Sequence, residues 1–192
     1  MTVARLGRSF FDRPTRIVAR QLIGCELWTR GPGVERGVRI VETEAYVGRD
    51  EANHANRGMT RRNRSMFGAP GTLYVYCIHR VVCANVVTRP GQAVLIRAGE
   101  PLGGTRELWA GGPGRLCRAL GITIADDGTD AAAGARIRFR PRRRRPRAIV
   151  SGPRIGISRA VERPLRFAEA GSRYVSSPRP WAGSAGKRPT SA

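Results

Sequence analysis

Hydrophobic positions along the chain follow two periods. A period of three to four residues runs through Phe10–Gly24, with Pro14 suited to a first turn, and predicts a short helix. A second short helix is predicted at Arg115–Leu120, where Gly121 provides a stop. Alternating or continuous runs of strand-forming residues predict β-strands at Val38–Val47, Leu73–Ile78, Ala93–Ala98, Ile137–Phe139 and Ile155–Ile157.

The length of 192 residues and the apolar fraction of 41% fit one globular domain. From Ser176 onward the sequence is rich in Ser, Pro and Gly, which predicts a flexible tail over residues 176–192 and a folded domain over residues 1–175. No eighteen apolar residues run together, and Val3–Leu6 is too short for a signal peptide. A cytoplasmic protein is therefore expected.

Net charge changes the picture most, because 35 basic residues oppose 14 acidic ones and give a balance of +21. Such a balance favours a polyanionic partner, since neutralised phosphates release counterions. The segment Arg140–Arg147 holds six arginines among eight residues and is predicted to be a loop. It suits a phosphate-contacting loop and a merely solvated one equally well. The same charge also fits a passively solvated, arginine-rich surface.

The cysteines and the single lysine limit the kinds of reaction that the chain can catalyse. The four cysteines show no CxxC spacing, so a zinc site is not predicted and buried thiols are expected: Cys25, Cys77, Cys83 and Cys117. Lys187 is the single lysine and lies in the predicted tail. A Schiff base formed by a buried lysine is therefore not expected.

Two carboxylates stand in the strand that begins at Val38. A period of two residues places Glu42, Glu44 and Tyr46 on one face, with Val38 and Ile40 on that same face. A carboxylate beside apolar and aromatic groups loses water, its pKa rises, and it can serve as a general base near neutral pH. The alternative is an edge strand whose glutamates face water or arginines.

A second cluster is aromatic. Tyr74 and Tyr76 share a face of the next predicted strand, and His54 lies in the loop before it. Together with Tyr46, His54 and Tyr76 can form a slot that stacks a base removed from the duplex. Electron-rich rings also attract cationic purines, such as those methylated on N3 or N7. Taken singly, each residue fits an ordinary core or loop position.

Six segments occur in an order that resembles one enzyme family. They are residues 41–46 (VETEAY), 62–67 (RNRSMF), 71–76 (GTLYVY), 94–101 (VLIRAGEP), 112–120 (GPGRLCRAL) and 163–167 (RPLRF). The set spans about residues 10–175 and resembles the 3-methyladenine (alkyladenine) DNA glycosylase family in its compact bacterial form. Six motifs in sequence are a specific signal, whereas one alone is weak.

The resemblance implies roles for individual residues. Glu44 matches the general base that deprotonates the attacking water, and Arg97 helps to hold that water, with a backbone carbonyl near Ile155 as a third anchor. The flipped base is enclosed by Tyr46, His54 and Tyr76, while Asn85 obstructs the 2-amino group of normal guanine. The implied fold is α/β mixed (α+β), a single domain around a curved antiparallel β-sheet with a protruding β-hairpin.

The implied activity is that of a monofunctional glycosylase. It flips 3-methyladenine, 7-methylguanine or hypoxanthine out of duplex DNA and hydrolyses the N-glycosidic bond, leaving an intact abasic site. No metal or cofactor is expected. The expected partner is double-stranded DNA with alkylated purines, bound by a monomer on the nucleoid. Candidate contacts to the DNA backbone are Arg61, Arg62, Arg64, Arg142 and Arg143.

The predicted hairpin tip departs from the family. A tyrosine that wedges into the duplex is replaced, and His79, followed by Arg80 in place of a turn glycine, is the nearest match. These two residues form either a substituted wedge or a tip that flips bases poorly. A non-catalytic nucleic-acid-binding protein would also account for the charge. A magnesium nuclease using Glu42 and Glu44 lacks an Asp or His to complete its ligands.

Overall fold

The computed structural model describes residues 4–102 and 108–180. In these ranges the chain forms one sheet of nine strands whose pairings are all antiparallel. The strands are β1 (Glu26–Gly31), β2 (Val34–Tyr46), β3 (Leu73–Ile78), β4 (Val81–Arg89), β5 (Gln92–Leu102), β6 (Ala110–Gly111), β7 (Ile137–Arg140), β8 (Ile149–Gly152) and β9 (Arg166–Glu169).

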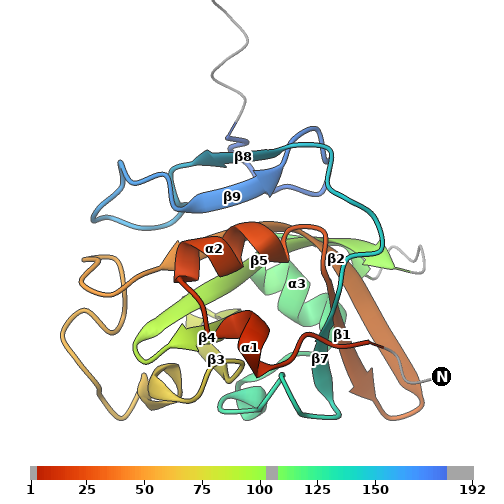
Figure 1. Cartoon of the computed structure of the whole chain (residues 1–192), viewed down its shortest axis with the longest axis horizontal. Helices are drawn as coiled ribbons and strands as arrows, with labels where there is room; N and C mark the ends of the chain where they lie inside the picture. The colour runs from red at the N-terminus through yellow and green to blue at the C-terminus, as the bar shows by residue number, and fades with distance from the viewer. Residues whose placement is uncertain (1–3, 103–107, 181–192) are drawn as a thin grey trace, which may run out of the picture.

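The sheet is strongly curled, and its strands follow the order β3-β4-β5-β2-β1-β7, with β6 beside β5 and the pair β8–β9 beside β2 (Figure 1). Helices α1 (Arg8–Phe11) and α2 (Thr15–Leu22) lie in front of the sheet in Figure 1. The main core joins apolar residues of these helices, of α3 (Pro113–Leu120) and of the sheet. The expected single domain of mixed α+β type around a curved antiparallel sheet is therefore confirmed.

The helix predicted over Phe10–Gly24 is two helices. Pro14 has no N–H to donate and precedes α2 as its N-cap, so the chain breaks between α1 and α2. The helix predicted before Gly121 is confirmed as α3, and Gly121 ends it in the left-handed conformation. None of the helices in the described ranges is long and apolar enough to cross a membrane.

A β-bulge in β2 decides which side chains reach the site. Before it, β2 pairs with β1 on one edge, and after it the same edge pairs with β9. The register of the pairing with β5 shifts at this point, where Val41 has no partner in β5 and is an extra residue. Residues after Val41 therefore point to the opposite face of the sheet from the one that the simple alternation predicts. Ile40 and Ala45 both belong to the main core, and Thr43 bonds the carbonyl of Ala19 in α2.

The predicted faces of β2 are thus half right. Glu42, Glu44 and Tyr46 share a face, because both carboxylates reach Arg97 and the hydroxyl of Tyr46 reaches Glu44. Val38 and Ile40 do not share it, since both pack in the main core on the other side. The bulge is the physical reason, because one inserted residue reverses the alternation.

Two further expectations were wrong. Residues 155–157 form no strand, because Gly156 has a φ of +77° and the N–H of Ile155 points at Glu44 rather than at a neighbouring strand. Ser176, expected in a flexible tail, is buried with 8% of its surface exposed and bonds Glu42. The rest of the predicted tail from residue 181 lies outside the described residues.

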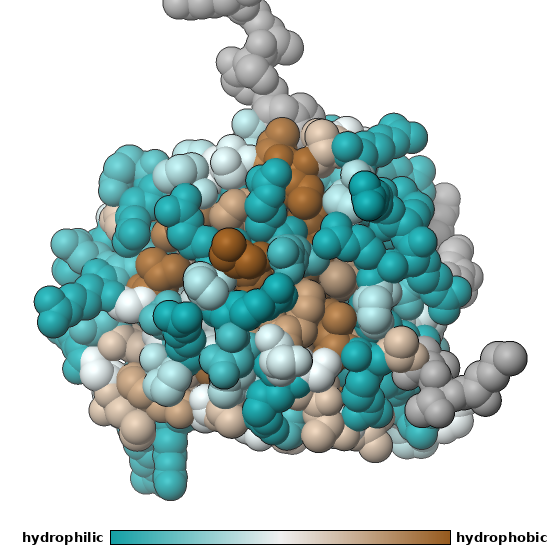
Figure 2. Space-filling model, viewed as in Figure 1, coloured by the Kyte–Doolittle hydropathy of each residue, from teal (hydrophilic) through white to brown (hydrophobic). Residues whose placement is uncertain are grey.

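The face seen in Figure 2 is dominated by hydrophilic side chains, with hydrophobic ones scattered among them. The loop after β7 contributes to the exposed charge, since every arginine from Arg142 to Arg145 is exposed. The loop predicted over Arg140–Arg147 begins one residue later, because Arg140 is the buried last residue of β7; residues 141–147 form no helix or strand, since like charges at this density favour exposure to water.

Candidate active site

Glu44 is enclosed by protein, with no exposed surface. Its Oε2 accepts a hydrogen bond from the Tyr46 hydroxyl at 3.0 Å, and its Oε1 accepts one from the N–H of Ile155 at 2.9 Å. The guanidinium of Arg97 lies 3.4 Å from the same Oε1. Burial raises the pKa of Glu44 above its ordinary value, and Arg97, Ile155 and Tyr46 oppose this rise. The result is a desolvated carboxylate held in one orientation.

Arg97 lies between two buried carboxylates. Its Nε is 3.4 Å from Glu42 and its Nη1 is 3.4 Å from Glu44. The pairing of β2 and β5 also skips at Arg97, which lies between the paired residues Ile96 and Ala98. Two opposed irregularities, one on each strand, therefore bring the arginine against both glutamates.

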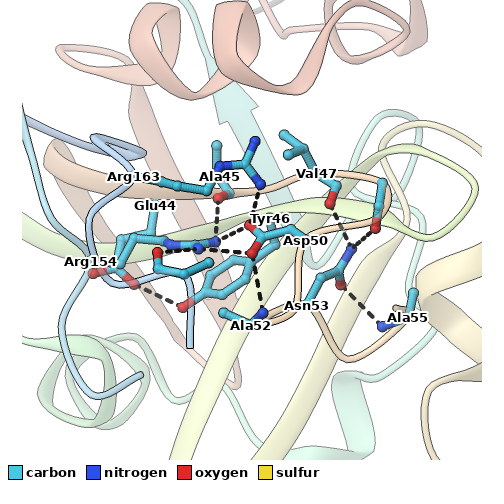
Figure 3. A network of polar contacts seen from close by, with 12 residues as sticks. Glu44, Ala45, Tyr46, Val47, Asp50, Ala52, Asn53, Ala55, Arg154 and Arg163 are labelled. Atoms are coloured by element: carbon cyan, nitrogen blue, oxygen red, sulfur yellow. Dashed lines mark hydrogen bonds and ion pairs between the residues drawn. The ribbon is translucent and has the colours of Figure 1, made fainter. Parts of the chain in front are cut away.

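The loop that carries Ile155 is fixed by a buried ion pair. Arg154 donates to both oxygens of Asp50, at 2.5 and 3.0 Å, and neither side chain has exposed surface. Figure 3 shows this pair beside β2, where Arg154 also donates to the carbonyl of Ala45 at 3.1 Å. Its guanidinium lies 4.8 Å from the centre of the Tyr46 ring. Arg154 therefore orients both donors to Glu44.

A cavity of about 310 Å³ opens beside this cluster. Three residues that contact Glu44 line it, namely Tyr46, Arg97 and Ile155. All four residues expected to enclose a base also line it: Tyr46, His54, Tyr76 and Asn85. Sequence reasoning missed Met66 and assigned no wall role to Tyr74, although its place on the face of Tyr76 was the available signal. A cavity of this size suits a single planar base.

The aromatic wall is held by ring contacts and one hydrogen bond. The rings of His54 and Tyr76 stand edge-to-face with centres 4.6 Å apart, and Tyr74 lies 5.3 Å from Tyr76. Nδ1 of His54 lies 2.9 Å from the Tyr74 hydroxyl. Desolvation and nearby Arg62 lower the pKa of His54, so its ring is neutral at pH 7. Desolvation raises the pKa of Tyr74 to about 12.

The hairpin of β3 and β4 ends in a two-residue turn formed by His79 and Arg80. Both have positive φ, +46° and +65°, which side chains disfavour by about 1–2 kcal/mol per residue. The turn is flanked by Ile78 and Val81, which are 42% and 38% exposed. His79 and Ile78 line the base cavity, whereas Arg80 lines the hollow beside it. The tip therefore presents apolar groups that sequence reasoning overlooked.

The candidate backbone arginines fall into two groups. Arg61, Arg62 and Arg64 are exposed in the segment before β3, and Arg62 donates to the carbonyl of Cys77 in the hairpin at 3.2 Å. Arg142 and Arg143 line a different hollow, which shares no residue with the base cavity. The structure thus brings Arg62 of the first group to the hairpin and places the second group at a separate hollow.

Three of the four cysteines are buried, namely Cys25, Cys83 and Cys117. All four lie in the described ranges and are thiols, but Cys77 is exposed, so the expectation that every thiol is buried was wrong. Cys77 sits near the hairpin tip, where the strands leave the body of the sheet. In the described ranges no three His, Cys, Asp or Glu side chains are grouped to hold a metal ion.

The chain is similar to known proteins over most of its length. The profile of the family described as Methylpurine-DNA glycosylase (MPG) matches residues 9–173. The chain belongs to this family. Its match extends from the helix pair to the segment after β9, and so includes Glu44, Arg97 and the whole aromatic wall of the cavity.

Several family members resemble the chain over most of its length. A protein of Rhizobium etli is 45% identical over 185 residues, which cover 89% of this chain and 88% of its own. One of Agrobacterium fabrum is 46% identical over 181 residues, covering 88% and 91%. One of Methanocella arvoryzae is 44% identical over 191 residues, covering 89% and 95%. Each carries the name "Putative 3-methyladenine DNA glycosylase".

Sequence reasoning about this family member missed three groups beside Glu44. Asp50 and Arg154 are 104 residues apart, and Ser176 lies 134 residues after Glu42. No local period connects residues this far apart. The one available signal was charge, because Asp50 is among the few acidic residues in a strongly basic chain.

Proposed function

We propose that the chain is a monofunctional DNA glycosylase that hydrolyses the N-glycosidic bond of alkylated purines in duplex DNA. The observation that carries this proposal is the desolvated Glu44, held by three residues that line an aromatic cavity of base size, namely Tyr46, Ile155 and Arg97. Its raised pKa makes it a stronger base than an exposed carboxylate. Family membership supports the same reaction.

In this reaction Glu44 takes a proton from a water as the water oxygen bonds to C1′ of the sugar. The bond from C1′ to the purine breaks, and its electron pair leaves with the base. An N3- or N7-methylated purine carries a positive charge, so it departs neutral and needs no proton. Arg97 lines the cavity 3.4 Å from Glu44 and is placed to hold the water. The carboxylate also stabilises positive charge that develops on the sugar.

Base selection follows from the walls of the cavity. Tyr46, Tyr76 and His54 offer ring faces and edges to a cationic purine, and a neutral His54 does not repel it. The Nδ2 of Asn85 donates to the carbonyl of Tyr74 at 3.0 Å, which fixes this side chain in the cavity wall. A fixed amide there obstructs the 2-amino group of guanine and so rejects the normal base.

The duplex is proposed to lie across the hairpin tip. Ile78 and Val81 can press between bases from the minor groove, and His79 and Arg80 contact the groove around them. Arg61, Arg62 and Arg64 contact phosphates beside the lesion, and Arg142 and Arg143 contact phosphates further away. We expect a monomer that acts on the nucleoid in the cytoplasm, with a main domain that comprises residues 1–175 and also includes the buried Ser176. The single lysine, Lys187, leads us to expect an intact abasic product.

The proposal is tested with duplex DNA that contains one 7-methylguanine and is treated with alkali to cut abasic sites. Wild type should produce the cut strand, and Glu44→Gln should slow single-turnover excision by about 10²–10⁴-fold. Binding to the damaged duplex should stay within about threefold, because Gln keeps the shape of the side chain. Glu51→Gln is the matched control, since Glu51 is exposed on the following loop.

Two outcomes would overturn this assignment. Excision by Glu44→Gln at the wild-type rate would remove Glu44 from the reaction. Salt-sensitive binding by the wild type, without preference for the lesion and without an abasic product, would instead show a non-catalytic nucleic-acid-binding protein. The strained tip at His79 and Arg80 is the feature that favours this second function.

A further inference from the structure

Ser176 makes three hydrogen bonds to Glu42 and Arg97, although it lies beyond residue 173, where the family match ends. Its N–H donates to Oε2 of Glu42 at 2.8 Å, and its hydroxyl donates to Oε1 of Glu42 at 2.9 Å. The same hydroxyl accepts a hydrogen bond from Nε of Arg97 at 3.0 Å. A single oxygen therefore connects the carboxylate of Glu42 to the arginine of the active site.

Arg166 holds this segment in place. It is almost wholly buried, and its Nε donates to Oε1 of Glu42 at 2.5 Å. Its other two nitrogens donate to the carbonyls of Ser176, at 2.9 Å, and Pro178, at 2.8 Å. Each nitrogen of the guanidinium thus has an acceptor, and two of these acceptors fix the chain after Val175 beside the site.

The position of Arg97 depends on this hydroxyl. Within the described ranges, the bond to Ser176 is the one hydrogen bond that the Arg97 side chain makes, since its contacts with Glu42 and Glu44 are ion pairs at 3.4 Å. An arginine between two carboxylates can turn toward either. The hydroxyl fixes Nε on the side of Glu42, and the planar guanidinium then directs Nη1 toward Glu44.

We propose that Ser176 is a positioning residue that orients Arg97 for the activation of water by Glu44, so that the segment beyond the family match completes the active site. This proposal rests on the proposed glycosylase function. Ser176 acts through Arg97 and does not touch the substrate. Loss of a purely structural anchor would destabilise the sheet. Loss of the Ser176 hydroxyl should instead leave the sheet intact and change the electrostatic environment of Glu44.

The experiment compares Ser176→Ala with wild type in the full-length chain. Removing one oxygen should lower the single-turnover rate by about 10–100-fold, the range expected for a hydrogen bond to a charged group. Affinity for the lesion duplex should stay within about threefold. Ser176→Thr keeps the hydroxyl and should recover most of the rate. Ser177→Ala is the matched control, because this neighbour is exposed.

The pH profile separates positioning from structure. Arg97 lowers the pKa of Glu44, so a poorly placed Arg97 should move the rising limb of the rate to higher pH. Among the other groups that act on the charge of Glu44 or respond to it, Glu42 loses one hydrogen bond in this variant. The remaining groups are unchanged: Tyr46, Tyr76, Cys83 and the N–H of Ile155.

Three results would overturn the proposal. One is a Ser176→Ala rate within twofold of an active wild type. Another is a rate loss with an unmoved pH midpoint and a lower melting temperature, which would show a structural anchor only. A wild type without excision activity would instead overturn the proposed function, and this inference with it. The first two results leave the glycosylase assignment standing.

Discussion

The buried ion pair of Asp50 and Arg154 offers the sharpest test of how the site is held. We expect Asp50→Asn to destabilise the protein strongly, although the two side chains have nearly the same shape. Arg154 would keep its charge, with an uncharged amide oxygen and the carbonyls of Ala45 and Ala160, at 3.1 and 3.5 Å, as its remaining acceptors. Asp50 also pairs with Arg163 at 3.7 Å, so a second cation would lose its partner.

The size of the effect follows from burial. Neither Asp50 nor Arg154 has exposed side-chain surface, so water cannot replace the missing charge. Removing one partner of a buried pair costs about 3–5 kcal/mol. For a chain of this length, each kcal/mol lowers the melting temperature by about 2–4 °C, so a fall of roughly 6–20 °C is expected.

Thermal unfolding followed by circular dichroism measures this fall, with Asp12→Asn as the control because Asp12 is exposed. The double variant Asp50→Asn/Arg154→Met should recover part of the loss, since it no longer buries an unpaired charge. Excision should slow in Asp50→Asn even well below its melting temperature, because Ile155 loses its support. A melting temperature within 2 °C of wild type would refute this reasoning and show that water reaches the pair.

Three further outcomes are expected. The rate of excision should rise with pH through the raised pKa of Glu44, because only the deprotonated carboxylate accepts a proton; a rate already flat from pH 4.5 upward would contradict this. Arg80→Gly should raise stability by about 0.5–1 kcal/mol in a denaturant titration, since glycine accepts the φ of +65°, and it should weaken DNA binding. Arg61→Ala should reduce the slope of log affinity against log salt concentration by about one; an unchanged slope would place Arg61 off the DNA.

Local patterns predicted the elements that local forces determine. Strand β3 has the predicted bounds Leu73–Ile78, because its aromatic and branched residues alternate and a glycine precedes them. Strand β4 was missed, since its turn at His79 and Arg80 carries no Gly, Asn or Asp to mark a hairpin. Strands β8 and β9 were missed because each has only four residues and is formed by pairing with distant segments.

Those site residues that share one face of a single strand could be predicted from the sequence. Tyr74 and Tyr76 follow the period of two, and so do Glu44 and Tyr46 after the bulge. The bulge itself could not be predicted, because it forms where β2 exchanges β1 for β9, a contact between segments far apart in the chain. The same long-range pairing decides which residues contact the two carboxylates. Residue types alone could therefore not predict these contacts.

The contact between β2 and β9 also sets the order in which the site can be completed during synthesis. Glu42 emerges early, while Arg166 follows 124 residues later. At about 5–20 residues per second, the ribosome takes roughly 6–25 s to supply that arginine. Through this interval Arg97 of β5 can already pair with Glu42, but the carboxylate still lacks the hydrogen bonds of Arg166 and Ser176. The chain therefore completes its catalytic cluster late, when its last strand arrives.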